Sequence, residues 1–156
     1  MKLTTAQLMQ SAIAEAKKAA EKDEVPVGAV IAKDGEIIAA CHNSVESGGC
    51  TLNHAEMSAI REAQAKLGKY LDGCEIFVTL EPCAMCMGAI IGSHIGRVYF
   101  GAFDRKGGCA GTVYDFTEGK LMAYKPVVIG GVMEKECAEI LTEYFNEKRE
   151  TRNIKR

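Results

Sequence analysis

The sequence predicts an α/β fold: a three-layer α/β/α sandwich in which helices cover both faces of a five-stranded mixed sheet. Short apolar runs typical of buried strands alternate along the 156 residues with segments of helical periodicity. Only the turn Lys33-Asp34-Gly35-Glu36 joins the first two strands, so they form a hairpin, whereas helices separate the later strands. No repeat, low-complexity tract or long linker interrupts the chain, which indicates a single domain over residues 1–156.

The N-terminal segment is expected to be an amphipathic helix followed by the hairpin. Residues 3–22 place apolar side chains at helical spacing among Lys and Glu, and Thr4 or Thr5 could cap this helix. The apolar run 25–32 predicts a buried strand, and residues 37–41 return as its partner.

The middle of the chain is expected to alternate between helix and strand. Residues 43–53 are polar and contain Gly48-Gly49, which predicts a loop. A helix follows from 54 to about 67, then a strand over 75–80 and a second helix over about 84–91.

The last third is expected to complete the sheet. Residues 97–101 predict a fourth strand, and the glycine-rich segment 103–114 predicts a mobile loop. A fifth strand over 127–130 and a closing helix from 134 to about 148 end the fold.

The charge of the chain is slightly acidic, with a formal net charge of −2. A protein that binds mainly through phosphate contacts is more often basic. Basic residues nevertheless crowd the C-terminus, at Lys148, Arg149, Arg152, Lys155 and Arg156. This cluster is either a solvated helix end or a short arm that contacts a nucleic-acid backbone.

The sequence favours a cytoplasmic protein with no membrane association. It has no run of 18 or more apolar residues, and its first residues lack the apolar core of a secretory signal. The chain has seven cysteines, which is an odd number, and two of them have the spacing of metal ligands. These cysteines are therefore better explained as thiols in a reducing compartment than as a disulfide framework.

Two short motifs carry the chemistry: His54-Ala55-Glu56 and Pro82-Cys83-Ala84-Met85-Cys86. An imidazole and two thiolates, from His54, Cys83 and Cys86, are three ligands of the kind that a catalytic zinc site uses, with the fourth position open for water. Zinc lowers the pKa of such a water from 15.7 towards ~7. Glu56 lies two residues from a ligand and can take the proton of that water.

Two other interpretations of these motifs are possible. A structural zinc site usually closes with a fourth Cys or His, but none of the remaining cysteines forms a second C-x-x-C or lies beside His54. A redox C-x-x-C would not require the upstream His-x-Glu. The composite spacing therefore favours a catalytic zinc.

The chain resembles the cytidine deaminase-like superfamily, whose signature is H-x-E followed by P-C-x-x-C, and within it the bacterial tRNA adenosine deaminases. The resemblance runs from the strand at 24–30 through Asn43 and both motifs to the terminal helix, with the two further segments 79–90 and 95–104. It implies a zinc hydrolase that converts an exocyclic amine to a carbonyl and releases ammonia. It also implies a homodimer that acts on the wobble adenosine of tRNA.

The same resemblance implies roles for individual residues. His54, Cys83 and Cys86 would hold zinc, and Glu56 would move the protons. Further residues would contact the substrate: Asn43 its sugar or base edge, Val27 and Ile91 its base, the backbone N–H groups near Ala55 and Cys83 its amine and water, and Asp104 its ribose or backbone. Asn43 is also a common turn residue, Asp104 also fits a solvated loop, and Val27 also fits plain core.

Two segments depart from the usual pattern of the tRNA enzymes: Gly49-Cys50-Thr51-Leu52-Asn53 before the first motif, and the short stretch 117–125. With the acidic charge they leave a second function open, deamination of a free nucleobase or nucleoside such as guanine, cytosine or adenosine. A third possibility is a non-catalytic, zinc-stabilised RNA-binding subunit. The presence of Glu56 disfavours it, because a non-catalytic protein does not need a carboxylate that moves protons.

Overall fold

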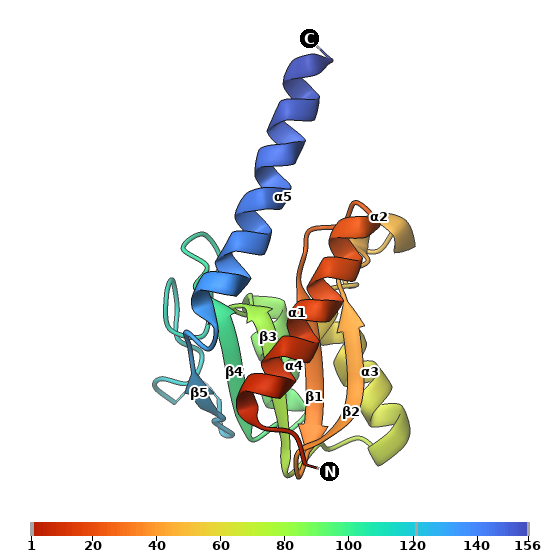
Figure 1. The fold of residues 1–156 in the computed structure, drawn as a ribbon. Helices are drawn as coiled ribbons and strands as arrows, with labels where there is room; N and C mark the ends of the chain where they lie inside the picture. Colours follow the sequence, from red (N-terminus) through yellow and green to blue (C-terminus); the bar gives the residue numbers. More distant parts are fainter. Residues whose placement is uncertain (1, 121, 156) are drawn as a thin grey trace.

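The computed structural model describes residues 2–120 and 122–155 and confirms the three-layer α/β/α sandwich (Figure 1). The elements follow one another as α1 (Thr5–Glu21), β1 (Gly28–Lys33), β2 (Glu36–His42), α2 (Val45–Gly48), α3 (Ala55–Leu67), β3 (Cys74–Leu80), α4 (Ala84–Gly92), β4 (Arg97–Ala102), β5 (Val127–Ile129) and α5 (Glu134–Ile154).

The sheet is mixed, with strand order β2-β1-β3-β4-β5. β1 pairs antiparallel with both β2 and β3, whereas β3, β4 and β5 run parallel. Hairpin strands can be antiparallel neighbours, but the parallel pair β3 and β4 needs the crossover helix α4 between them. The hairpin and the helix-separated strands of the sequence therefore produce the two halves of one sheet.

Alternation along each strand divides the core into two clusters. Ile31, Ile76 and Val98 lie in the cluster on the α3 and α4 face, while Phe77 and Tyr99 lie in the cluster on the α1 and α5 face. Successive side chains of a strand point to opposite faces, so strands buried on both faces read as continuous apolar runs.

Helix α1 is fixed at its N-terminus and along its middle. Thr4 is its N-cap: the Thr4 side chain accepts from the N–H of Gln7, and the Gln7 side chain accepts from the N–H of Thr4. Further along, α1 lies so close to the start of β1 that a Cβ on Gly28 would stand 1.9 Å from the carbonyl oxygen of Ala12. Gly28 is thus required by the close contact between helix and strand.

The segment 43–53 differs from the predicted loop because it contains the short helix α2. The carboxylate of Glu24 accepts hydrogen bonds from the N–H groups of Glu46 and Ser47, which lie in the first turn of α2. This long-range cap, 22 residues away along the chain, stabilises a helix whose own sequence has little helical signal.

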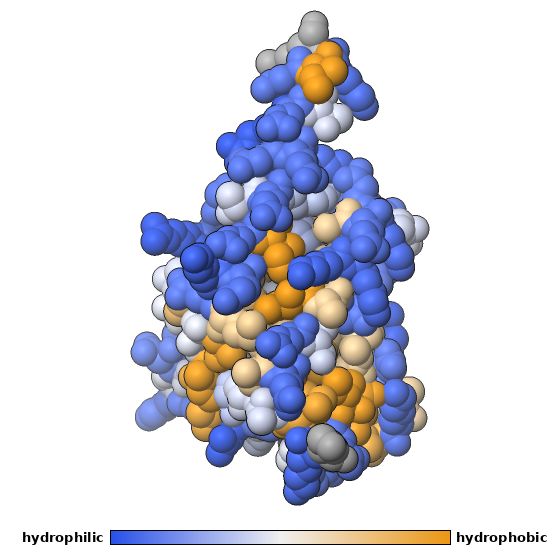
Figure 2. Space-filling view, viewed as in Figure 1, coloured by the Kyte–Doolittle hydropathy of each residue, from blue (hydrophilic) through white to orange (hydrophobic). Residues whose placement is uncertain are grey.

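Helix α5 also differs from the prediction, because it continues to Ile154 instead of ending near Lys148. It projects beyond the body of the molecule (Figure 1), and Figure 2 shows that its outer part is mostly hydrophilic. Arg156, the last residue of the predicted basic cluster, lies outside the described residues. None of the described helices combines the length and the apolar character that a membrane span requires.

Candidate active site

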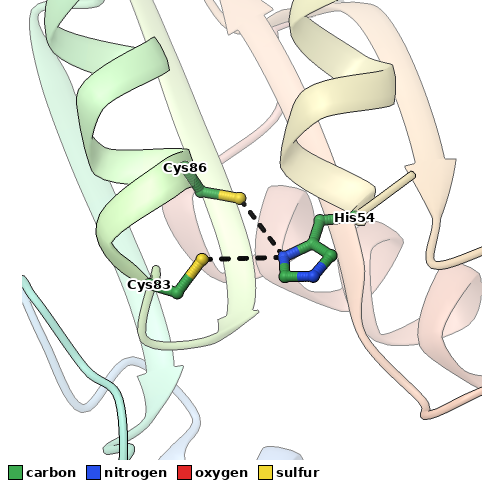
Figure 3. Close-up of side chains that lie close together, drawn as sticks. All are labelled: His54, Cys83 and Cys86. Atoms are coloured by element: carbon green, nitrogen blue, oxygen red, sulfur yellow. Dashed lines mark hydrogen bonds between the residues drawn. The ribbon is translucent and has the colours of Figure 1, made fainter. Parts of the chain in front are cut away.

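Two helix N-termini carry the predicted metal ligands. His54 is the N-cap of α3 and Cys83 is the N-cap of α4, which follows directly after β3. Both residues have extended backbone, and neither side chain caps its own helix. An N-cap side chain commonly binds the backbone of its helix; here the two side chains point towards each other instead (Figure 3).

The ligand atoms are spaced as zinc requires. The Nδ1 atom of His54 lies 3.6 Å from the Sγ of Cys83 and 3.5 Å from the Sγ of Cys86. Zn–N and Zn–S bonds of ordinary length, at a tetrahedral angle, place N and S about 3.6 Å apart. All three atoms lie within 4.8 Å of one another, so the donor set fits a zinc ion with one position left open.

The close contact of the two thiols shifts their pKa values in opposite directions. Contacts with the Cys86 thiol and with His54 lower the pKa of Cys83 to about 4. The neighbouring Cys83 and burial raise the pKa of Cys86 well above its ordinary value. A divalent cation would displace the remaining proton, because zinc binds thiolates.

Glu56 lies in the first turn of α3, and its side chain is buried at 4% exposure. Burial is the main cause that raises the pKa of this carboxyl above its ordinary value. It lines the same cavity as His54 and Cys83. The structure therefore places a carboxyl beside the ligand group.

A cavity of about 300 Å³ opens over the ligands. Val27, Asn43, Ala55 and Asp104, which were predicted to contact substrate, line it, whereas Ile91 does not line it and packs in the core cluster. The side chain of Asn43 is held in place, because its Nδ2 donates to the carbonyl of Val25 and its Oδ1 accepts from the N–H of Val45. The structure thus brings the predicted substrate contacts Val27, Asn43, Ala55 and Asp104 to the cavity that holds His54, Cys83 and Glu56, and Cys86 joins the site through its contact with His54.

Besides Glu56, two buried carboxylates that sequence reasoning missed line the cavity, Glu24 and Glu81. Both are buried, and both accept hydrogen bonds from backbone N–H groups of the cavity rim. The position of Glu81 directly before Pro82-Cys83 was the available signal. Glu24 offered none, since its partners lie in a segment that was predicted to be a loop.

Residues 3–102 match the model of the cytidine and deoxycytidylate deaminase zinc-binding region. The chain belongs to this deaminase family. It is accordingly a hydrolytic enzyme that acts on a C–N bond, and zinc is the metal that its His-Cys-Cys group binds.

Relatives of this deaminase cover nearly its whole length. It is 46% identical over 149 residues to a tRNA-specific adenosine deaminase of Bacillus subtilis, an alignment that covers 95% of this chain and 92% of the relative. A solved structure from a study of A-to-I editing by tRNA:A34 deaminases superposes with a TM-score of 0.84 at 42% identity, covering 86% and 99% of the two chains. A guanine deaminase from Nitrosomonas europaea superposes with a TM-score of 0.76 at 25% identity, covering 91% and 85%.

Proposed function

We propose that this deaminase converts adenosine to inosine at the wobble position of tRNA, with release of ammonia. The observation that carries the proposal is the 46% identity to a tRNA-specific adenosine deaminase over almost the full length of both chains. The solved tRNA:A34 deaminase structure supports it with the same fold at 42% identity.

The side chains of the cavity support this chemistry. His54, Cys83 and Cys86 would hold zinc, which as a Lewis acid would lower the pKa of water to ~7. Glu56 would take one proton from the attacking water and pass it to the ring nitrogen N1 as the oxygen bonds to C6 of adenine. It would then move the remaining hydroxyl proton to the exocyclic amine, so that the C6–N bond breaks, ammonia leaves and the C6 carbonyl forms. Burial of Glu56 keeps bulk water away from this proton transfer.

The walls of the cavity support the binding of a single extruded base. Val27 offers apolar surface, the held amide of Asn43 faces the cavity, and the N–H of Ala55 belongs to the free N-terminus of α3. A base inside a duplex cannot reach such a site, so the enzyme takes a flipped or loop nucleotide.

Helix α5 supports an RNA substrate because it contacts the chain directly before Glu24, a residue of the cavity wall. Lys148 contacts the Asp23 carboxylate at 2.6 Å, and the Tyr144 hydroxyl donates to the same residue. Asp23 precedes Glu24, which lines the cavity. The basic residues Arg149, Arg152 and Lys155 therefore follow from the cavity rim outwards, where phosphates next to the target nucleotide would lie.

We also propose a homodimer and a cytoplasmic location. The outward face of α4 carries no charged side chain, which suits contact with a second copy. All seven cysteines are free thiols, which suits a reducing compartment.

Parallel assays of ammonia release from tRNA, adenosine, guanine and cytosine test the substrate, with a deletion of residues 149–156 as the matched variant. Turnover of tRNA should be fastest. It should weaken with salt, with a log–log slope of about 0.7 for each phosphate contacted on a single strand, and the deletion should flatten that slope. Release from guanine or another free base alone, insensitive to salt and to the deletion, would replace tRNA with a small-molecule substrate.

A further inference from the structure

We propose that Glu81 is a positioning residue: its buried carboxylate holds the loop 103–114 in place at the mouth of the cavity. The loop carries Asp104, and it is rich in glycine. Its composition predicts a mobile segment, but the structure ties it to one side chain. The kinetic part of this inference rests on the proposed tRNA substrate, whereas the structural part does not.

Three backbone N–H groups of the loop converge on the carboxylate. The N–H groups of Asp104, Ala110 and Thr112 each donate to it at 3.1 Å, and the Thr112 hydroxyl donates as well. Backbone N–H groups that converge on one point form an anion-binding concavity. Here a carboxylate of the same chain fills it.

Among the described residues, every hydrogen bond that the Glu81 side chain accepts comes from the loop. The side chain is 2% exposed, and among the described residues it forms no salt bridge with Lys, Arg or His. A buried carboxylate without partners is strongly unfavourable, so the loop amides are the groups that stabilise it. The loop shape and the buried charge therefore depend on each other.

Gly108 is fitted to this contact. A Cβ at position 108 would lie 2.4 Å from the Cδ of Glu81, nearer than any side chain allows. The backbone of Gly108 is not in the left-handed region, so close approach, and not backbone freedom, explains the glycine. The loop thus packs directly on the carboxyl group.

Backbone bonds join the same loop to the turn that bears a zinc ligand. The N–H of Glu81 donates to the carbonyl of Ala102 at 2.8 Å, and the N–H of Cys109 donates to the carbonyl of Pro82 at 2.9 Å. Cys83 follows immediately. The metal-binding turn and the loop that presents Asp104, Arg105 and Lys106 therefore form one unit, with Glu81 at its centre.

Loss of the carboxylate should loosen the loop while the ligands and Glu56 remain. In the variant Glu81→Gln only one oxygen can accept, so at least one loop N–H loses its partner. Hydrogen exchange at the amides of Asp104, Ala110 and Thr112 should become at least about tenfold faster. The reason is that a hydrogen bond to a charged group stabilises the closed loop by about a factor of ten or more in its opening equilibrium. With an anticodon stem-loop as substrate, KM should rise about tenfold or more and kcat should change less, since the loop holds substrate and does not move protons.

The matched control is Glu24→Gln, the other buried carboxylate of the cavity rim. Its hydrogen bonds go to Glu46 and Ser47, so exchange should become faster at those amides and stay unchanged in the loop 103–114. A milder variant, Thr112→Val, removes only the hydroxyl contact and should give a smaller increase confined to the loop. If Glu81→Gln does not fold, hydrogen exchange of Thr112→Val tests whether the contact with Glu81 holds the loop.

Unchanged loop exchange in zinc-loaded Glu81→Gln, or in Thr112→Val when the former does not fold, would overturn the proposal. A loss confined to kcat with KM unchanged would overturn the positioning role as well. If wild-type enzyme does not deaminate the stem-loop, the tRNA proposal fails, and the exchange measurement still decides the role of Glu81.

Discussion

His54 and Cys83 have unusual places in their helices. Each is an N-cap residue whose side chain leaves its own helix uncapped. The first-turn N–H groups and the helix dipole then favour negative charge on the thiolates and on water. The helix start that a Ser or Asp would normally stabilise is used to create a metal site.

The variant Cys86→Ala should lose zinc, because two ligands hold it much less tightly than three. Cys86 is buried and lies 3.5 Å from the His54 Nδ1. Metal analysis of purified protein should give about one zinc per chain for wild type and far less for the variant. Cys74→Ala, which removes a buried thiol elsewhere, is the control and should keep its metal. Full zinc content in Cys86→Ala would mean that the ligand set is wrong.

The variant Glu56→Ala should keep zinc and the fold but lose nearly all turnover. General acid–base groups contribute ~10²–10⁴-fold, and a residue that moves several protons can exceed that. Steady-state rates together with metal analysis measure both effects. The control is Glu62→Ala, which removes an exposed carboxylate of the same helix and should leave turnover normal. A near-normal rate for Glu56→Ala would show that Glu56 has no part in the mechanism.

At the scale of elements, α1 and β1 depend on one another through Gly28. The Cβ of an alanine at position 28 would overlap the backbone of α1 at Ala12 and Ala16. Backbone cannot yield as the end of a flexible side chain does, so helix or strand must shift.

Gly28→Ala should therefore lower the free energy of unfolding by about 3 kcal/mol, at the upper end of the usual range for overpacking. Urea unfolding followed by circular dichroism measures the change. Gly92→Ala is the control, because Gly92 is exposed at the end of α4 with no atom within 4 Å of the new Cβ. It should be neutral or slightly stabilising. Equal stability of wild type and Gly28→Ala would show that the contact is looser than it looks.

Elements with strong local signals were predicted well, and those fixed by distant contacts were not. The apolar runs at Ile76 and Val98 and the capped start of α1 at Thr4 are local features. Helix α2 was missed because the cap that stabilises it comes from Glu24. The contacts of the glycine-rich loop with Glu81 were not predicted, because they depend on a side chain more than 20 residues away along the chain.

In the candidate site, too, the residues with a local sequence signal were predicted and the contacts between distant segments were not. Residue types and spacing were enough to select His54, Cys83, Cys86 and Glu56, because zinc chemistry restricts which groups can serve. The path of α5 past Asp23 was not visible in the sequence, since it depends on how the last helix crosses the sheet.

At the scale of the molecule, the dimer proposal gives a measurable mass. Light scattering at micromolar concentration should give twice the 16.8 kDa of one chain. Ala89→Glu on the partly buried outer face of α4 should shift the protein to monomer, because the charge would be desolvated at the contact. Ala65→Glu at an exposed position of α3 should not. A wild-type mass of one chain would count against the dimer.

The outer end of α5 also makes the free enzyme a target for trypsin. Within residues 149–155, the side-chain hydrogen bonds that form stay inside the helix itself, and short helical stretches without packing partners open readily in water. Trypsin cleaves after Lys and Arg, so it should trim the chain at Arg149 and Arg152 long before it attacks the sheet. A bound RNA that covers these residues would slow the trimming, so the digestion time course would report binding without any turnover.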